Sequence, residues 1–106
     1  MPALTSTFSA LGDPVRFAIA ERLLEQGALP AGALRDVADI SAPAISRHLR
    51  VLKEAGIVTQ SADGTRRIYA IDPAAVKRID AWLQRHRQMW SVGMDRLAGA
   101  LEDENR

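Results

Sequence analysis

The clearest pattern of apolar and polar positions in the chain begins after Ser41. Apolar side chains recur there at the three- and four-residue spacing of a helix: Ile45, Leu49 and Leu52. Ser41 can cap this helix through its hydroxyl, so we expect the helix to begin at about Ala42. The opposite side carries small, hydroxyl and cationic side chains: Pro43, Ser46, Arg47 and Arg50. The pattern therefore predicts a helix with one buried side and one basic, exposed side.

A hairpin is predicted directly after this helix. Gly56 ends the helix, because glycine adopts the left-handed conformation without steric cost. We expect strands at Ile57–Ser61 and Arg66–Ile71, joined by a turn at Ala62–Thr65 whose Asp-Gly pair favours a tight hairpin. The second strand begins with two arginines, which therefore lie beside the hairpin tip.

Positive charge is concentrated in this helix and hairpin. Five bases lie between Ser41 and Tyr69: Arg47, Arg50, Lys53, Arg66 and Arg67. The same stretch has two acids, Glu54 and Asp63, so its net charge is +3, whereas the whole chain carries +1. A basic surface on a nearly neutral chain indicates an anionic partner such as nucleic acid.

The same residues carry a resemblance to a known family. The run S-x-P-A-I-S-R-H-L-x-V-L-x-E-A-G-I-V, followed by G-x-R-R-x-Y, resembles the winged helix-turn-helix repressors of the arsenic-repressor (ArsR/SmtB) family. The resemblance extends over about Thr5–Leu101 and is most specific at Ser41–Tyr69. It implies a mainly α fold with a two-stranded β wing. It also implies small homodimers that bind operator DNA and mostly act as repressors.

Three further helices are predicted before Ser41. We expect a short helix at Thr5–Leu11 and a second one from Pro14 to Gly27, because an Asp-Pro pair is a strong start signal and glycine a stop signal. Ala31–Ala38 is expected to form the short first helix of the helix-turn-helix. The helix-turn-helix motif then covers residues 31–55. The wing covers residues 57–71.

A long helix is predicted over Ala74–Leu101, with Pro73 at its start. Its apolar stripe is too broad for a small wing to cover, so we expect the same helix of a second copy to pack against it. The predicted dimer interface comprises Phe8, Ile79, Trp82, Leu83, His86, Trp90, Leu97 and Leu101. The alternative is that this stripe packs within one subunit.

Length and composition fit one folded domain spanning residues 1–106. The chain is 47% hydrophobic and 25% charged, as in ordinary globular proteins. It has no apolar run of membrane-spanning length and no secretory leader, so we expect a cytoplasmic protein without a membrane partner. Because it contains no cysteine, disulfides, thiolate metal sites and thiol oxidation are excluded.

The sequence offers no constellation for catalysis or metal binding. Neither His48 nor His86 has the partners of a catalytic triad, so an enzyme is not expected. Positions that hold metal-binding cysteines in the resembled family are here Arg35 and Val37, and Asp80 is not followed by the family's histidine. We therefore expect no metal and no cofactor, although an Asp/Glu/His site across a dimer stays open. Arg35 receives no role.

These observations predict a sequence-specific, DNA-binding transcriptional regulator, and the resemblance favours a dimeric repressor at an inverted-repeat operator. The candidate DNA-binding residues are Ser41, Pro43, Ser46, Arg47, His48, Arg50, Lys53, Arg66 and Arg67. Residues on the exposed side of the helix would enter the major groove. Ser41 and Lys53 would hold phosphates, and the wing arginines would reach the backbone or the minor groove.

Two alternatives accompany this prediction. His48 lies nearer the buried side of the helix, so a structural role competes with a contact to a base. A protein-interaction module, whose basic surface meets an acidic protein, is the competing function. The sequence indicates no effector.

Overall fold

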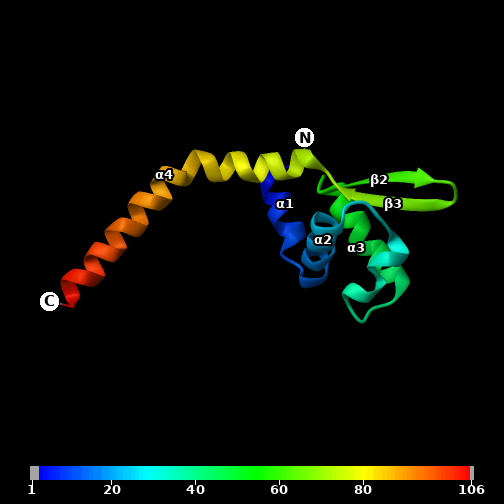
Figure 1. The fold of residues 1–106 in the computed structure, drawn as a ribbon, viewed down its shortest axis with the longest axis horizontal. Coiled ribbons are helices and arrows are strands. Elements are labelled where there is room, and N and C mark those ends of the chain that lie inside the picture. Colours follow the sequence, from blue (N-terminus) through cyan, green and yellow to red (C-terminus); the bar gives the residue numbers. More distant parts are fainter. Residues whose placement is uncertain (1–2, 106) are drawn as a thin grey trace. The chain divides into compact units, whose positions relative to one another are not determined.

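The computed structural model describes residues 3–105, in a first unit that ends at Val76 and a second that begins at Lys77. The first unit contains α1 (Leu4–Leu11), α2 (Pro14–Gln26), β1 (Leu29–Pro30), the 3-10 helix η1 (Ala31–Val37), α3 (Ala42–Glu54), β2 (Val58–Asp63) and β3 (Arg66–Ile71). The long helix α4 (Pro73–Glu104) starts in the first unit and makes up the second. Figure 1 labels most of these elements along the chain. The predicted fold, mainly helical with a β hairpin, is confirmed.

Side-chain caps fix the starts of α2 and α3. Asp13 Oδ2 accepts hydrogen bonds from the backbone N–H groups of Val15 (2.9 Å) and Arg16 (3.0 Å). Ser41 Oγ accepts a hydrogen bond from the Ala44 N–H at 3.3 Å. Each cap satisfies donors that have no partner within the helix, as the sequence predicts for Asp13-Pro14 and for Ser41.

The wing is the hairpin of β2 and β3, and Gly64 turns its tip with a φ of 64°. A third strand, β1, pairs antiparallel with β3, so the sheet order is β1-β3-β2. Only the two strands of the hairpin were predicted. A strand of two residues is too short to show a hydrophobic period, and only its pairing with β3 makes it a strand.

The first element of the helix-turn-helix is a 3-10 helix. A short helix was predicted at Ala31–Ala38, and the structure has it at Ala31–Val37, followed by an extended Ala38. This tighter form is common in short connecting pieces. Leu34 of this helix is fully buried. An ion pair of 2.8 Å between Arg22 and Asp36 joins α2 to η1.

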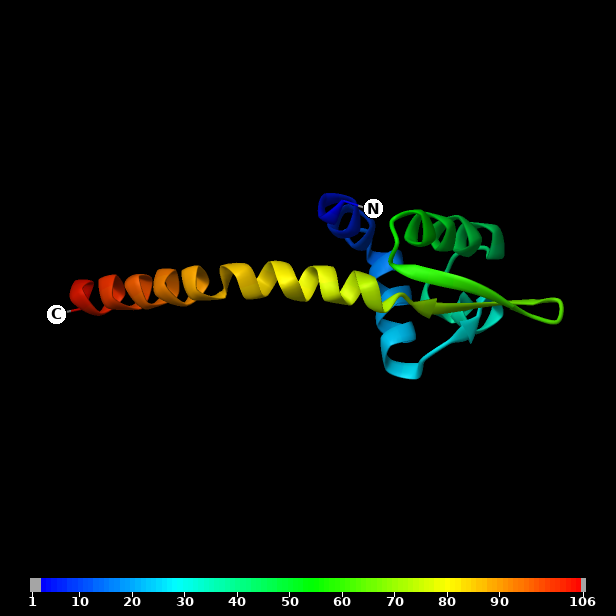
Figure 2. The same ribbon diagram turned by 90° about the horizontal axis from the view of Figure 1, so that it is seen from above.

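One hydrophobic core holds α3 and the wing together. Ile45, Leu49 and Leu52 of α3 have at most 1% of their surface exposed. They lie in one cluster with side chains from α2, η1 and the hairpin, among them Ile19, Leu23, Leu34, Ile57, Val58 and Tyr69. Figure 2 shows α3 running beside the hairpin, and contacts between α3 and β2 agree with this view. The core therefore fixes where the opposite, polar side of α3 points.

The long helix predicted at Ala74–Leu101 is confirmed as one uninterrupted helix, which continues to Glu104. Gly93 lies within it and does not end it. Many apolar side chains of α4 remain exposed in the single chain, among them Leu83 (49%), Met89 (71%), Trp90 (51%) and Leu97 (61%).

Candidate nucleic-acid interface

The exposed side of α3 is the first part of the candidate interface. Ser46, Arg47 and Arg50 are exposed, and Pro43 lies exposed in the first turn. None of these positions is acidic, and the first acid of the helix is Glu54, its last residue. The predicted division of α3 into a buried and a basic side is therefore confirmed, and the basic side offers donors to phosphates and base edges.

The second part is the side of the hairpin that faces α3. Side chains two residues apart on a strand point to the same face, so Arg67 and Tyr69 share one face of β3. Gln60 of β2 lies directly opposite Tyr69 in the ladder and therefore joins them. On α3, Ser46, Leu49, Arg50 and Lys53 follow each other at helical spacing and form the facing wall.

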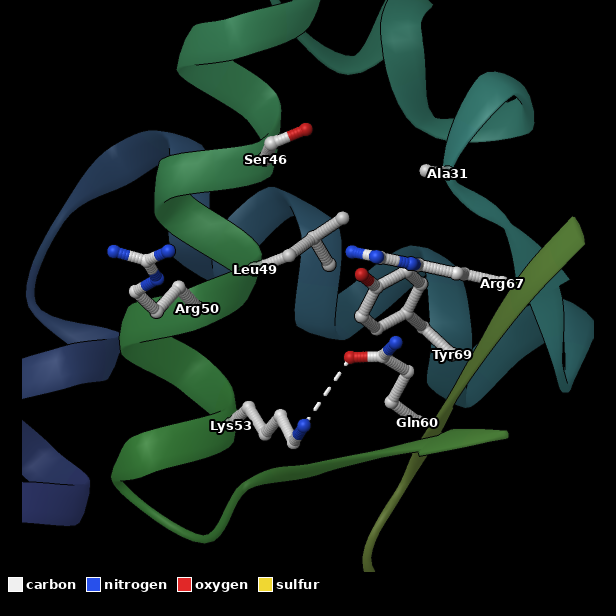
Figure 3. Close-up of a pocket in the computed structure, with 8 residues that line it drawn as sticks. All are labelled: Ala31, Ser46, Leu49, Arg50, Lys53, Gln60, Arg67 and Tyr69. Carbon is white, nitrogen blue, oxygen red and sulfur yellow. Dashed lines mark hydrogen bonds between the residues drawn. The ribbon is translucent and has the colours of Figure 1, made fainter. Parts of the chain in front are cut away.

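These two walls enclose a cavity of about 320 Å³, which we call the helix–wing cavity. Its lining residues are Ala31, Ser46, Leu49, Arg50, Lys53, Gln60, Arg67 and Tyr69. In Figure 3, Arg67 extends from the hairpin toward α3, whereas Arg50 points away from Tyr69. A hydrogen bond of 3.2 Å from Lys53 Nζ to Gln60 Oε1 spans the cavity from α3 to β2.

The cations of this surface are not neutralised. Within residues 3–105, the side chains of Arg47, Arg50, Lys53, Arg66 and Arg67 form no ion pair with a carboxylate. The two wing arginines, predicted as equivalent, differ in their surroundings. Arg67 faces the helix–wing cavity, whereas Arg66 is the ladder partner of Asp63 at the hairpin tip. Only Arg67 therefore shares a cavity with the cations of α3.

His48 points toward the start of α2. Its Nδ1 lies 3.4 Å from Arg16 Nη1 and 3.9 Å from Asp13 Oδ2, and 23% of its side chain is exposed. The hydrogen bond from the Arg16 N–H, with the Arg16 charge in addition, lowers the pKa of the Asp13 carboxyl below its ordinary value. These contacts favour the structural role for His48, and its contact with DNA stays a prediction.

Sequence reasoning missed Gln60 and Tyr69 as lining residues of the helix–wing cavity, and Arg16 as the neighbour of His48. The alternation of Arg67 and Tyr69 along β3 was a usable signal, since residues two apart share a face. Gln60 and Arg16 gave no such signal. Gln60 meets Lys53 only because β2 packs against α3, and Arg16 meets His48 across 32 positions of the sequence.

The predicted dimer residues of the second unit gather on one side of α4. Leu83, Trp90 and Leu97 recur every seven residues, the period of helices that pair with each other. The ring centroids of Trp82 and His86 lie 5.2 Å apart, and those of Trp82 and Trp90 lie 6.1 Å apart. An apolar groove of about 380 Å³ runs along Trp82, His86, Met89, Trp90, Gly93, Met94 and Leu97. The interface itself stays a prediction, as does the part of Phe8 in it.

Metal-binding and membrane-spanning features were also sought. Residues 3–105 contain no group of three or more His, Cys, Asp or Glu side chains arranged to hold a metal ion. None of the helices in the described part of the chain has the length and apolar character to cross a membrane. Arg35 is exposed on η1, and its role stays unassigned.

Comparisons with known proteins agree with this geometry. A family model described as a helix-turn-helix domain matches residues 11–61. The HTH-type transcriptional regulator Rv2034 of Mycobacterium tuberculosis is 37% identical over 97 residues, which are 92% of this chain and 87% of that protein.

Solved structures show the same fold. The ArsR family transcriptional regulator RHA00566 matches with a TM-score of 0.74 at 28% identity, over 83% of this chain and 96% of that chain. The homodimeric winged helix-turn-helix DNA-binding domain Mb0332 of Mycobacterium bovis matches with a TM-score of 0.63 at 27% identity, over 79% of this chain and 77% of that one. The basic side of α3, the wing beside it and these likenesses together show that the chain belongs to the ArsR family of winged helix-turn-helix, DNA-binding transcriptional regulators.

Proposed function

We propose that the protein is a homodimeric repressor that acts in the cytoplasm and binds an inverted-repeat operator, with α3 of each subunit in a major groove. The observation that carries this proposal is the basic side of α3. Its exposed side chains can donate hydrogen bonds, and the buried side holds the helix firmly on the core. Such a helix presents donors at fixed positions, which direct readout of base edges requires.

The candidate residues take different roles in this proposal. Arg47 and Arg50 reach base edges, because arginine can donate two hydrogen bonds to guanine, and Pro43 and Ser46 lie close to the bases beside them. Lys53 and Ser41 hold phosphates, which fix the register of α3 without reading sequence. Arg66 and Arg67 extend this contact to the backbone or the minor groove beside the wing.

The dimer is supported by the apolar stripe of α4. Side chains as large as Leu83, Trp90 and Leu97 are about half exposed or more in the single chain. Water contact of so many large apolar groups on one helix is unfavourable, and pairing with the same helix of a second copy removes it. A two-fold dimer then reads an operator with two-fold symmetry, and an occupied operator excludes other proteins from the same DNA.

Selection of genomic fragments bound by the purified protein tests the proposal. We expect the selected fragments to share an inverted repeat whose half-site centres lie one helical turn, or a multiple of it, apart. Affinity for the selected duplex should exceed that for a scrambled duplex by about 10³-fold or more, and both affinities should fall steeply with added salt. Equal affinity for the two duplexes would contradict the proposal and favour an acidic protein as the partner.

A further inference from the structure

A polar cluster of Asp13, Arg16 and His48 lies where α1, α2 and α3 meet. These three helices contact one another, with α2 between the other two in Figure 1. His48 is two positions from Ser46 and therefore about 160° around α3 from it. Ser46 lines the helix–wing cavity, whereas His48 faces α2. The cluster is thus separate from the helix–wing cavity.

We propose that Arg16 is a positioning residue for DNA recognition, which couples α1 to the recognition helix α3 through His48. Arg16 itself need not touch DNA in this role. It holds the orientation of α3, and with it the orientation of the neighbouring Arg47. The inference rests on the proposed function, because it takes α3 as the element that reads the operator.

The guanidinium group of Arg16 connects the two helices on either side of it. Its Nε donates a hydrogen bond of 2.7 Å to the carbonyl oxygen of Ala10, and its Nη1 lies 3.4 Å from His48 Nδ1. Because the guanidinium is planar and rigid, one group holds the α1 carbonyl and the His48 ring at a fixed separation. A displacement of α1 therefore either breaks one of these contacts or moves His48.

Helix ends stabilise the cluster. Ala10 lies in the last turn of α1, where a cation is favourable beside carbonyl oxygens that lack a partner in the helix. Asp13 caps the start of α2 and lies 3.9 Å from His48 Nδ1. All three side chains are partly buried, so water and salt screen their charges less than on an open surface. The contact with His48 therefore rests on an ordered support.

The contact with His48 adds what the hydrophobic core does not supply. Burial of Ile45, Leu49 and Leu52 is non-directional, whereas a hydrogen bond depends on the positions of particular atoms. At about 6 Å from a helix axis, a rotation of 10° moves a group by about 1 Å. Bidentate contacts between arginine and a base depend on geometry at this scale, whereas charge attraction to a phosphate changes little. Loss of the link should therefore reduce sequence preference more than general DNA affinity.

The first experiment measures the affinities of Arg16→Lys and His48→Ala for the selected operator and for a scrambled duplex. Lysine keeps the charge but lacks the planar fork that reaches two partners. We expect each variant to weaken operator binding by about tenfold, the order of one hydrogen bond that involves a charged group. Binding to the scrambled duplex should change by less than about twofold, because the phosphate contacts remain.

Three further variants test whether Arg16 acts through His48. The double variant of Arg16→Lys with His48→Ala should lose no more operator affinity than either single variant, since both break the same link. His48→Asn retains a hydrogen-bond acceptor near the position of Nδ1 and should recover most of the loss. The matched control is Arg22→Ala, which breaks the 2.8 Å ion pair from α2 to Asp36 and should leave the ratio of the two affinities unchanged.

The second experiment needs no DNA and measures amide hydrogen exchange of the free protein. Arg16→Lys should speed exchange by about tenfold both in the last turn of α1 and in α3 around His48, because both lose a contact. Arg22→Ala should leave both segments as in the wild type. Urea unfolding of each variant separates such a local change from a general loss of stability.

The outcomes separate this inference from the proposed function. Equal losses on the two duplexes would overturn the inference, and so would faster exchange in α1 alone. If His48→Asn loses as much affinity as His48→Ala, His48 contacts DNA directly and the inference also fails. If the wild type shows no preference among duplexes, the proposed function fails, and the exchange measurement then decides whether Arg16 couples α1 to α3.

Discussion

His48 Nδ1 on the recognition helix α3 lies 3.4 Å from Arg16 Nη1 near the start of α2. The same arginine donates a hydrogen bond of 2.7 Å from Nε to the carbonyl oxygen of Ala10 in α1. Arg16 thus links three helices, and one of its partners is the residue next to Arg47.

Asp13, which caps α2 beside Arg16 and His48, should stabilise the fold in a pH-dependent way. Asp13→Ala should lower the free energy of unfolding at pH 7, because the N–H groups of Val15 and Arg16 lose their acceptor. The folded-state pKa of this carboxyl is lowered, chiefly by the Arg16 N–H, so its stabilisation is full above the ordinary value of 3.8 and is lost as pH falls through the folded pKa. The difference in the free energy of unfolding between the wild type and Asp13→Ala should therefore be smaller at pH 3 than at pH 7.

Urea unfolding at pH 7, 5 and 3 measures this difference. Asp13→Asn is the matched control, since it keeps an acceptor for the cap but removes the charge. At pH 7 its free energy of unfolding should lie between those of the wild type and Asp13→Ala. If the free energies of unfolding of the wild type and Asp13→Ala differ as much at pH 3 as at pH 7, the carboxylate charge is not the cause of the stabilisation.

Arg47→Ala should reduce both affinity and sequence preference. Arg47 is exposed on the side of α3 opposite Ile45 and Leu49. Loss of one bidentate base contact should cost about 1–3 kcal/mol on the operator and relax preference at one position of each half-site. Competition binding to the operator and to a random duplex measures both effects. An equal loss on the two duplexes would instead identify Arg47 as a phosphate contact.

Leu83→Asp should convert the dimer into monomers. Leu83 is 49% exposed in the single chain and lies on the seven-residue stripe of α4. A carboxylate there would be buried without a partner on pairing, which is unfavourable. Sedimentation analysis gives the oligomeric state. Gln88→Asp introduces the same charge about 140° around the helix from Leu83, and this control should remain dimeric. A dimeric Leu83→Asp variant would place the interface elsewhere.

Operator binding should be insensitive to arsenite, cadmium, zinc and thiol oxidants at micromolar concentrations. Soft metals and oxidants act on thiolates, and the chain contains no cysteine. A closed zinc site needs about four converging ligands, whereas the described chain offers no group of three. Titration of each compound into the protein–operator complex tests this. Release of DNA by stoichiometric zinc would reveal a site shared between subunits, for which His86 is the first candidate.

Local sequence signals determined where α2 and α3 begin, which side of α3 is buried and where the hairpin turns. Asp13-Pro14 and Ser41 start α2 and α3, and the spacing of Ile45, Leu49 and Leu52 separates the buried from the basic side of α3. These features follow from the sequence alone because capping and helical periodicity involve residues within a few positions of each other. The hairpin was predictable for the same reason, since Gly64 permits its tight turn.

The form of η1 and the contacts between separate elements were decided only by the tertiary structure. β1 exists because β3 pairs with it, and the short helix predicted at Ala31–Ala38 takes the tighter 3-10 form. Gln60 and Lys53 meet across the helix–wing cavity, and Arg16 reaches His48 over 32 positions in the sequence. The contacts depend on the strand register and on how α3 packs against the core. A local sequence pattern specifies neither the register nor this packing.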